Sequence, residues 1–227
     1  MSRPELTTTS YAILGFLAIR PWTTYELAQQ MQRTLNHMWP RARSKLYEEP
    51  KKLVAHGLAT ASKDAVGRRA RTVYAITPAG RRALAAWLRT PSDDGMALES
   101  EYLVKLFFAD HGRTQDALAT LQATKAWALQ QLDVFAEAAR VYLAGEGAFR
   151  ERAAVNMVGA RFMVDFYALV ADWTDWANEV MASWPDHPKN AEPDWELMEE
   201  IYRRARPGST RVGQTGAGGH PRRRSIR

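Results

Sequence analysis

The chain has 227 residues, 46% of them hydrophobic, which is enough for a real core in one large domain or two small ones. It has no cysteine, which excludes disulfides, thiolate metal sites and a cysteine nucleophile. Residues 1–90 carry a charge of +10, residues 91–200 carry −12 and residues 201–227 carry +8. The positive first segment is typical of a protein that meets a polyanion, because Lys and Arg displace counterions from phosphates; an ordinary, unevenly charged surface would account for the charge equally well.

Two helices are predicted at the start of the chain. The apolar run 11–19 follows possible helix caps at 7–10 and ends before Pro21, as a core helix would. The run is too short to span a bilayer and no small-residue cleavage site follows it, so we expect a soluble, cytoplasmic protein without membrane contact. The second helix is amphipathic and begins after Thr23, to which Glu26 supplies the acid of a capping box.

A third helix is predicted from the basic residues that follow Pro40 to a stop at Gly57. The side that we expect to face the core holds Leu46, Leu53 and Val54. On or beside the opposite side lie Arg43, Ser44, Tyr47 and Lys51. Pro50 lacks a backbone donor, so we expect it to bend the helix or to split it near Tyr47.

A β-hairpin with a cationic loop is predicted next. Residues 58–62 and 72–77 have the composition of short strands, and the loop 63–71 between them contains three arginines. Pro78 then begins a helix that runs to about Leu88. The Pro, Ser, Asp and Gly residues of 91–95 predict a linker out of this first unit.

The remainder of the chain is predicted to be helical, with helices over 99–110, 114–143, 149–184 and 194–204. The first long helix has an apolar seam with one polar interruption, formed by Leu118, Leu121, Lys125, Ala128, Leu132, Phe135, Ala139 and Tyr142. The second long helix has a seam of the same spacing, formed by Val155, Val158, Phe162, Phe166, Leu169, Trp173, Trp176, Val180 and Trp184. Few other elements can cover these seams, so we expect the helices to pack between subunits of a homodimer.

The order of these elements predicts both the fold and a partner. Two helices, a third helix with a basic start and a basic hairpin are typical of a winged helix-turn-helix, whose third helix enters the major groove of double-stranded DNA. We therefore predict a mainly α fold with a small β-hairpin, in which a C-terminal long-helix dimerisation domain follows the winged helix. We expect three parts: a winged helix-turn-helix DNA-binding domain over 1–90, a helical domain for dimerisation and as the candidate effector domain over 96–204, and a disordered basic tail over 205–227.

The first unit also resembles a known family. The segments TSYAILGFLA, TTYELAQQM, SKLYEEPKKLVAHGL and VYAITPAGRRALAAWL, followed by EYLVKLFFAD, are similar to the PadR family of bacterial transcriptional regulators. The resemblance is close from Ser10 to Asp110, and the chain departs from it at Thr24, where the family commonly has glycine. It implies a homodimeric repressor that, in some members, a small molecule releases from its operator.

The resemblance also implies which residues contact DNA. On the third helix and the hairpin these are Arg43, Ser44, Lys45, Tyr47, Arg68, Arg69 and Arg71, and we add Arg41 from its position. Arg and Lys can neutralise phosphates or pair with guanine edges, and hydroxyl groups can donate to phosphates or bases.

An effector site is a second expectation. Aromatic residues crowd the last long helix at Tyr167, Trp173, Trp176 and Trp184. At a dimer interface such side chains can enclose a planar or cationic ligand, but an aromatic stripe at this spacing is also what the core of a dimer requires.

Enzymatic activity, cofactors and bound metal are not expected. The five histidines are scattered, and the sequence has no phosphate-binding glycine loop and no nucleophile elbow. A set of carboxylates could be imagined as a metal site but fits an exposed helix face better: Glu99, Glu101, Asp165, Asp172 and Asp175. The alternative to a DNA-binding regulator is a winged helix that serves as a protein–protein assembly module, which would not need the arginines of the hairpin.

Overall fold

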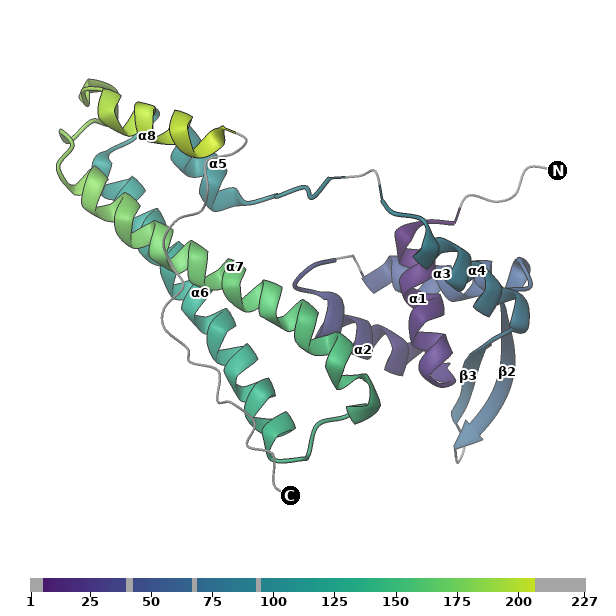
Figure 1. The fold of residues 1–227 in the computed structure, drawn as a ribbon. Helices are drawn as coiled ribbons and strands as arrows, with labels where there is room; N and C mark the ends of the chain where they lie inside the picture. The colour runs from purple at the N-terminus through teal and green to yellow at the C-terminus, as the bar shows by residue number, and fades with distance from the viewer. Residues whose placement is uncertain (1–5, 40–42, 67–68, 93–94, 207–227) are drawn as a thin grey trace, which may run out of the picture. The chain divides into compact units, whose positions relative to one another are not determined.

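The structure is a computed structural model that describes residues 6–39, 43–66, 69–92 and 95–206, with the backbone alone for 43–46, 64–66, 69 and 70. The chain divides into two compact units, Met1–Glu99 and Ser100–Arg227, and each is considered by itself (Figure 1). The first unit contains α1 (Thr8–Ile19), β1 (Trp22–Thr23), α2 (Thr24–Leu35), α3 (Arg43–Ala55), β2 (Ala59–Val66), β3 (Arg69–Ile76) and α4 (Pro78–Arg89). The second contains α5 (Glu101–Phe107), η1 (Ala109–His111), α6 (Thr114–Leu143), η2 (Arg150–Arg152), α7 (Ala153–Ala182), η3 (Pro188–Asn190) and α8 (Trp195–Ala205).

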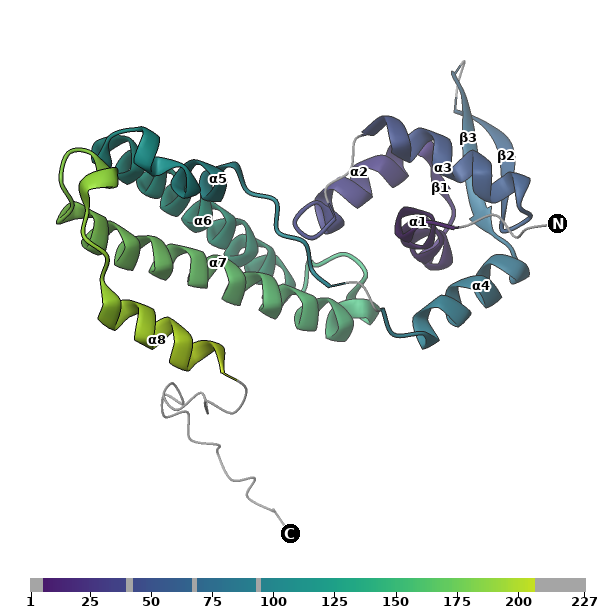
Figure 2. The same ribbon diagram turned by 90° about the horizontal axis from the view of Figure 1, so that it is seen from above.

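Helix α1 is the centre of the first unit. Its apolar residues point in all directions, and Ile13, Leu14 and Leu17 are almost completely buried. Helices α3 and α4 and strand β3 pack against it, and Figure 2 looks nearly along its axis, with α2, α3 and α4 around it. Such a helix cannot be stable at the surface, so its position in the core follows from its composition.

The helix ends of the first unit are where the sequence predicts them. The Thr23 side chain accepts a hydrogen bond from the backbone N–H of Glu26, whose carboxylate in turn accepts one from the Thr23 backbone. The Thr77 side chain caps α4 by accepting a hydrogen bond from the backbone N–H of Gly80, with Pro78 in the first turn. Gly57 follows α3 with φ of 69°, a left-handed conformation that favours glycine at a helix C-terminus.

The small sheet is larger than the sequence predicts. Its order is β1-β3-β2, fully antiparallel, and the two-residue strand β1 pairs Trp22 with Tyr74. Strands β2 and β3 pair from Ala59 and Ile76 as far as Val66 and Arg69, so most of the predicted loop is strand. A protruding hairpin has no core to face and therefore shows no apolar alternation, which is why the sequence pattern does not mark its outer half.

Pro50 does not split α3, although a split is one of the two outcomes that we expected from the sequence. The helix is continuous from Arg43 to Ala55, with Pro50 inside it. Pro50 is fully buried, next to Glu49 and three residues before Leu53, which are buried too. The missing N–H removes one intrahelical hydrogen bond, and the packing of this buried side offsets that loss.

In the second unit, α6 and α7 form a long antiparallel hairpin (Figure 1). At its open end the Thr114 backbone N–H donates to the Asp186 carbonyl at 2.9 Å, and the Thr114 hydroxyl donates to the Pro185 carbonyl. At the closed end Gly145 has φ of 84° and ends α6. The hairpin is thus tied at both ends within one chain.

Within the chain, α7 buries a different stripe of residues from the predicted seam, whose expected partner is a second subunit. The residues that α7 buries are Met163, Tyr167, Ala171, Thr174, Ala177 and Met181. Three of these six, Ala171, Thr174 and Ala177, are small, which lets α6 approach closely there. Five members of the predicted seam are exposed, among them Val158 at 75%, Phe162 at 56% and Leu169 at 64%, whereas Trp173 and Trp184 are partly buried. On α6, by contrast, Leu121 and Ala128 are buried as predicted.

Candidate nucleic-acid interface

Helix α3 has one buried side and one exposed side. Glu49, Pro50 and Leu53 are buried, whereas Tyr47 and Lys51 are exposed, as the sequence predicts for the latter two. The exposed side also carries Lys52 and Glu48, whose carboxylate accepts a hydrogen bond from the Lys51 ammonium at 3.0 Å. A basic helix face with a tyrosine is suited to phosphate contacts and to reading base edges in a major groove.

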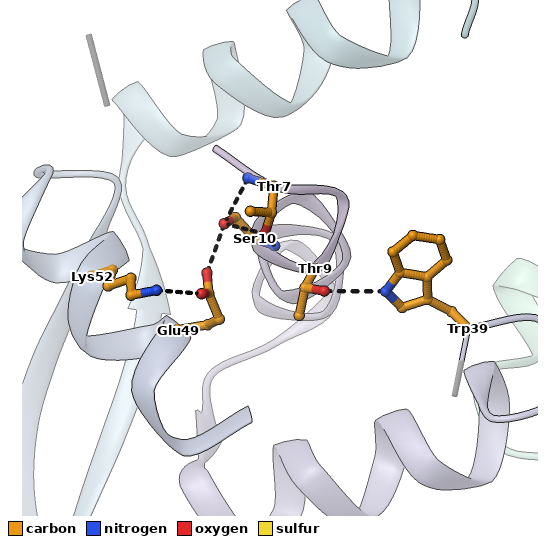
Figure 3. Close-up of polar contacts among 6 residues, drawn as sticks. All are labelled: Thr7, Thr9, Ser10, Trp39, Glu49 and Lys52. Carbon is orange, nitrogen blue, oxygen red and sulfur yellow. Dashed lines mark hydrogen bonds and ion pairs between the residues drawn. The ribbon is translucent and has the colours of Figure 1, made fainter. Parts of the chain in front are cut away.

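The buried carboxylate of α3 is a residue that sequence reasoning missed. The Ser10 hydroxyl of α1 donates to Glu49 Oε2 at 2.7 Å, and the Lys52 ammonium donates to Glu49 Oε1 at 2.8 Å (Figure 3). Burial raises the pKa of Glu49, but the hydrogen bonds from Lys52 and Ser10 outweigh it and hold the pKa below its ordinary value. A signal was present, because Glu49 lies three residues after Leu46 and four before Leu53, on the apolar stripe of the helix.

A second contact joins α1 to the segment before α3. The indole N–H of Trp39 donates to the Thr9 hydroxyl at 3.1 Å, and Figure 3 shows it beside the Glu49 contact. Thr9 is itself buried. Both partners on α1 belong to its first turn, which is stabilised by the reciprocal hydrogen bonds between Thr7 and Ser10.

The hairpin brings a second set of basic residues to the first unit. Arg71 is exposed on β3, opposite Asp64 of β2, and Arg69 lies two residues nearer to the tip, opposite Val66. Hydrogen bonds from Thr23 are the main cause of the lowered pKa of Glu26, and the positive charges of Arg20 and Arg71 contribute to it. Arg71 of the hairpin is therefore connected electrostatically to the start of α2.

Not all of the predicted DNA contacts lie within the described part of the chain. Arg41 and Arg68 fall outside the described residues. Arg43, Ser44 and Lys45 form the start of α3 and Arg69 lies on β3, and for these four the structure gives the backbone alone. Tyr47 and Arg71 are described completely and are exposed.

The four aromatic residues predicted as an effector site do not form one group. Tyr167 is buried and its ring packs against Trp127, Phe135 and Phe166 at centroid distances of 5.3, 6.0 and 5.5 Å. Burial raises the pKa of its hydroxyl. Trp173 and Trp184 pack instead against the apolar cluster of Ala117, Leu121, Ala177 and Met181, and Trp176 is exposed.

Several of the carboxylates considered for a metal site are in ion pairs. Lys125 of α6 donates to both oxygens of Asp175 of α7, at 2.6 and 2.7 Å. Within α7, Arg161 pairs with Asp165. Over the residues that the structure describes, no three His, Asp or Glu side chains come together in a way that could hold a metal ion.

Comparisons with known protein families match both units. The model of the "Transcriptional regulator PadR-like family" matches residues 13–86, and that of the "Virulence activator alpha C-term" family matches residues 99–182. A curated relative, the negative transcriptional regulator PadR of Bacillus subtilis (strain 168), is 27% identical over 108 residues. That match covers 47% of this chain and 59% of the relative, so the chain spans somewhat more than half of the relative's length.

Solved structures have the same fold over most of the chain. The crystal structure of Bacillus subtilis PadR in complex with operator DNA has a TM-score of 0.68 at 19% identity, covering 77% of this chain and 99% of that one. The same protein in complex with p-coumaric acid has a TM-score of 0.63 at 18% identity, covering 78% and 100%. At these identities the likeness shows a common fold, a winged helix followed by long helices.

Proposed function

Because this chain belongs to the PadR-like family of DNA-binding transcriptional regulators, we propose that it is a homodimeric repressor that binds one specific DNA sequence through α3 and the β2–β3 hairpin. In this proposal the first unit binds DNA, and the second joins two subunits and responds to a small aromatic molecule. A regulator of this kind acts by occupying DNA, so it needs a surface that is complementary to the duplex rather than catalytic residues.

The orientation of α3 is the observation that carries the proposal. Glu49, which is hydrogen-bonded to Ser10 of α1, and Leu53 are buried, while Tyr47, Lys51 and Lys52 are exposed together with Glu48. Among the described residues of the first unit, α3 packs mainly against α1, α2 and β2, and Tyr47, Lys51 and Lys52 remain exposed. The operator complex of the Bacillus subtilis relative supports the same use of this fold.

The exposed apolar stripe of α7 supports the dimer. Val155, Val158, Phe162, Leu169 and Trp176 follow each other at spacings of three, four and seven residues on the side that α6 leaves uncovered. A stripe of this size in water is unfavourable. A heptad-like spacing is what the packing of two long helices requires, so we propose that the same stripe of a second subunit covers it.

A bilayer is the other environment in which such a stripe could lie. By length and composition, the stretch Arg150–Ala182 could cross a membrane, which is weak evidence by itself. The helix carries the Arg161–Asp165 ion pair and shares the Lys125–Asp175 ion pair with α6. Charged groups are costly within hydrocarbon, so a subunit interface fits α7 better.

The hairpin arginines provide the test of the DNA-binding surface. Replacing Arg68, Arg69 and Arg71 by alanine should weaken binding to the DNA upstream of the protein's own gene and flatten the dependence of affinity on salt, because fewer counterions are released. A matched control replaces the three arginines of α4, Arg81, Arg82 and Arg89, and should change both quantities less. Fluorescence anisotropy over a salt series measures both. If the two triple variants had equal effects, non-specific charge attraction would explain the DNA binding. That result would favour a protein–protein assembly module.

A further inference from the structure

We propose that the first turn of α1 positions the DNA-reading part of α3, and that Glu49 is the positioning residue through which it does so. This inference rests on the proposed function of α3, and it concerns residues that do not themselves face DNA. Two neighbouring residues of α1 form hydrogen bonds on either side of the reading segment: Thr9 accepts one from Trp39, and Ser10 donates one to Glu49 (Figure 3).

The contact between Ser10 and Glu49 is buried and directional. Ser10 is 3% exposed and Glu49 is 7% exposed, with 2.7 Å between the hydroxyl and the carboxylate. The Ser10 hydroxyl is the donor of this bond, because an ionised carboxylate can only accept, and the Ser10 oxygen accepts the Thr7 backbone N–H at 3.2 Å. A hydrogen bond to a charged acceptor is short and strongly oriented, unlike an apolar contact.

The second contact completes the arrangement. Trp39 and Glu49 are ten residues apart, and between them lie the four α3 residues that the family resemblance implies as DNA contacts, Arg43, Ser44, Lys45 and Tyr47. Thr9 and Ser10 are consecutive in α1, so one rigid turn holds both ends of this segment. An apolar core alone would allow α3 to slide or rotate, whereas two directional bonds to one turn define its position.

The position of Glu49 on α3 explains why its hydrogen bond to Ser10 affects the side chains that we propose to read DNA. Glu49 and Tyr47 lie on opposite sides of α3, so a rotation that breaks the bond to Ser10 also moves Tyr47 and Lys51. Recognition of bases requires side chains held to within about half an ångström or about 10–20°. Lys52 neutralises the carboxylate from the exposed side, and this lowers the cost of keeping a charge in the core.

The test begins with the free protein, which makes it independent of any DNA. Glu49→Gln keeps the shape of the side chain and removes its charge, and Ser10→Ala removes the donor. Each should raise amide hydrogen exchange in α3 by roughly tenfold relative to α4, as expected for the loss of a charged hydrogen bond. The effect of the double variant should be less than the sum of the two single effects, because both substitutions weaken the hydrogen bond between Ser10 and Glu49. The control is Thr23→Ala, which removes the cap of α2 and should leave the ratio of α3 to α4 exchange unchanged.

Binding to operator DNA and to a scrambled duplex then separates positioning from general stability. In Glu49→Gln and Ser10→Ala the preference for operator should fall by roughly tenfold, while the salt dependence stays as in the wild type, because no phosphate contact is lost. Unchanged α3 exchange, or an unchanged preference for operator, would overturn the proposal. If the wild type prefers no DNA sequence, the proposed function fails, and the exchange measurement still decides whether α1 anchors α3.

Discussion

At the residue scale, the distribution of side chains around α3 determines what the first unit can do. Tyr47 and Lys51 could be placed on the exposed side from the sequence, because Leu53 and the glycine stop fix the register of the helix. Glu49 could not be placed in the core from the sequence, because a carboxylate is buried only where it has a hydrogen-bond partner, and the sequence does not show that partner. That partner, Ser10, is 39 residues away in the chain, and helical periodicity carries no information about such a contact.

The lowered pKa of Glu49 predicts a dependence of stability on pH. Because the folded-state pKa lies below the ordinary value of 4.5, the ionised group stabilises the fold fully above pH 4.5, and this contribution is lost as the pH falls through the folded-state value. We expect the free energy of unfolding of Glu49→Gln to be lower than that of the wild type by about 1–3 kcal/mol near neutral pH. The difference should shrink in strong acid.

Urea unfolding at about pH 7 and about pH 3, followed by tryptophan fluorescence, measures this difference. Glu48→Gln is the control, because Glu48 is exposed and pairs with Lys51 on the surface, and such pairs contribute little to stability. A Glu49→Gln deficit that is the same at both pH values would show that the carboxylate charge does not stabilise the fold.

At the scale of elements, the sequence predicted the helices better than their faces. The caps at Thr23 and Thr77 and the stop at Gly57 are local signals, and the structure confirms them. The face that α7 turns to α6 is not a local property. Two stripes of residues run along α7: one is buried against α6, and the other is apolar and exposed. From the sequence we took the more apolar stripe as the packing face, and the sequence could not show that a second stripe packs against α6 within the chain.

The large stripe of α7 gives a prediction for the second unit. Phe162→Glu places a charge in the proposed subunit interface, where it would have no partner, and should raise the dimer dissociation constant by roughly 100-fold or more. Sedimentation equilibrium measures this constant directly. Gln122→Glu adds the same charge at an exposed polar position of α6 and should leave it unchanged. A wild-type protein that sediments as a compact monomer at micromolar concentration would contradict the interface.

At the scale of the whole molecule, the chain joins a basic winged helix to a unit of long helices, and residues 91–200, which make up most of that unit, are acidic. The fold class and the family follow from the order of the elements and from segments within residues 10–110, and the structure and the family comparisons confirm both. The effector site could not be predicted in this way. It depends on which aromatic side chains the helices leave accessible, and three of the four chosen from the sequence pack inside or partly inside the second unit.

The proposed effector gives a prediction at this scale. We expect a planar aromatic acid, with p-coumaric acid as the probe, to change tryptophan fluorescence saturably and to weaken the binding of the protein to its operator. The effect on DNA follows if the ligand favours a conformation with lower operator affinity. Cyclohexanecarboxylic acid, which has the charge without the aromatic ring, is the control. An absence of any saturable response to aromatic acids would contradict an aromatic effector.

The most direct test of the central claim is fluorescence anisotropy of the purified protein with labelled DNA from upstream of its own gene and with a scrambled duplex of equal composition, at about 0.15 M salt. Non-specific attraction is weak at this salt concentration, so a difference between the two duplexes reports sequence recognition. We predict at least about a 1000-fold preference for the native fragment, with one dimer bound to two half-sites about 34 Å apart. Equal, weak binding to both duplexes would contradict a sequence-specific regulator of its own promoter.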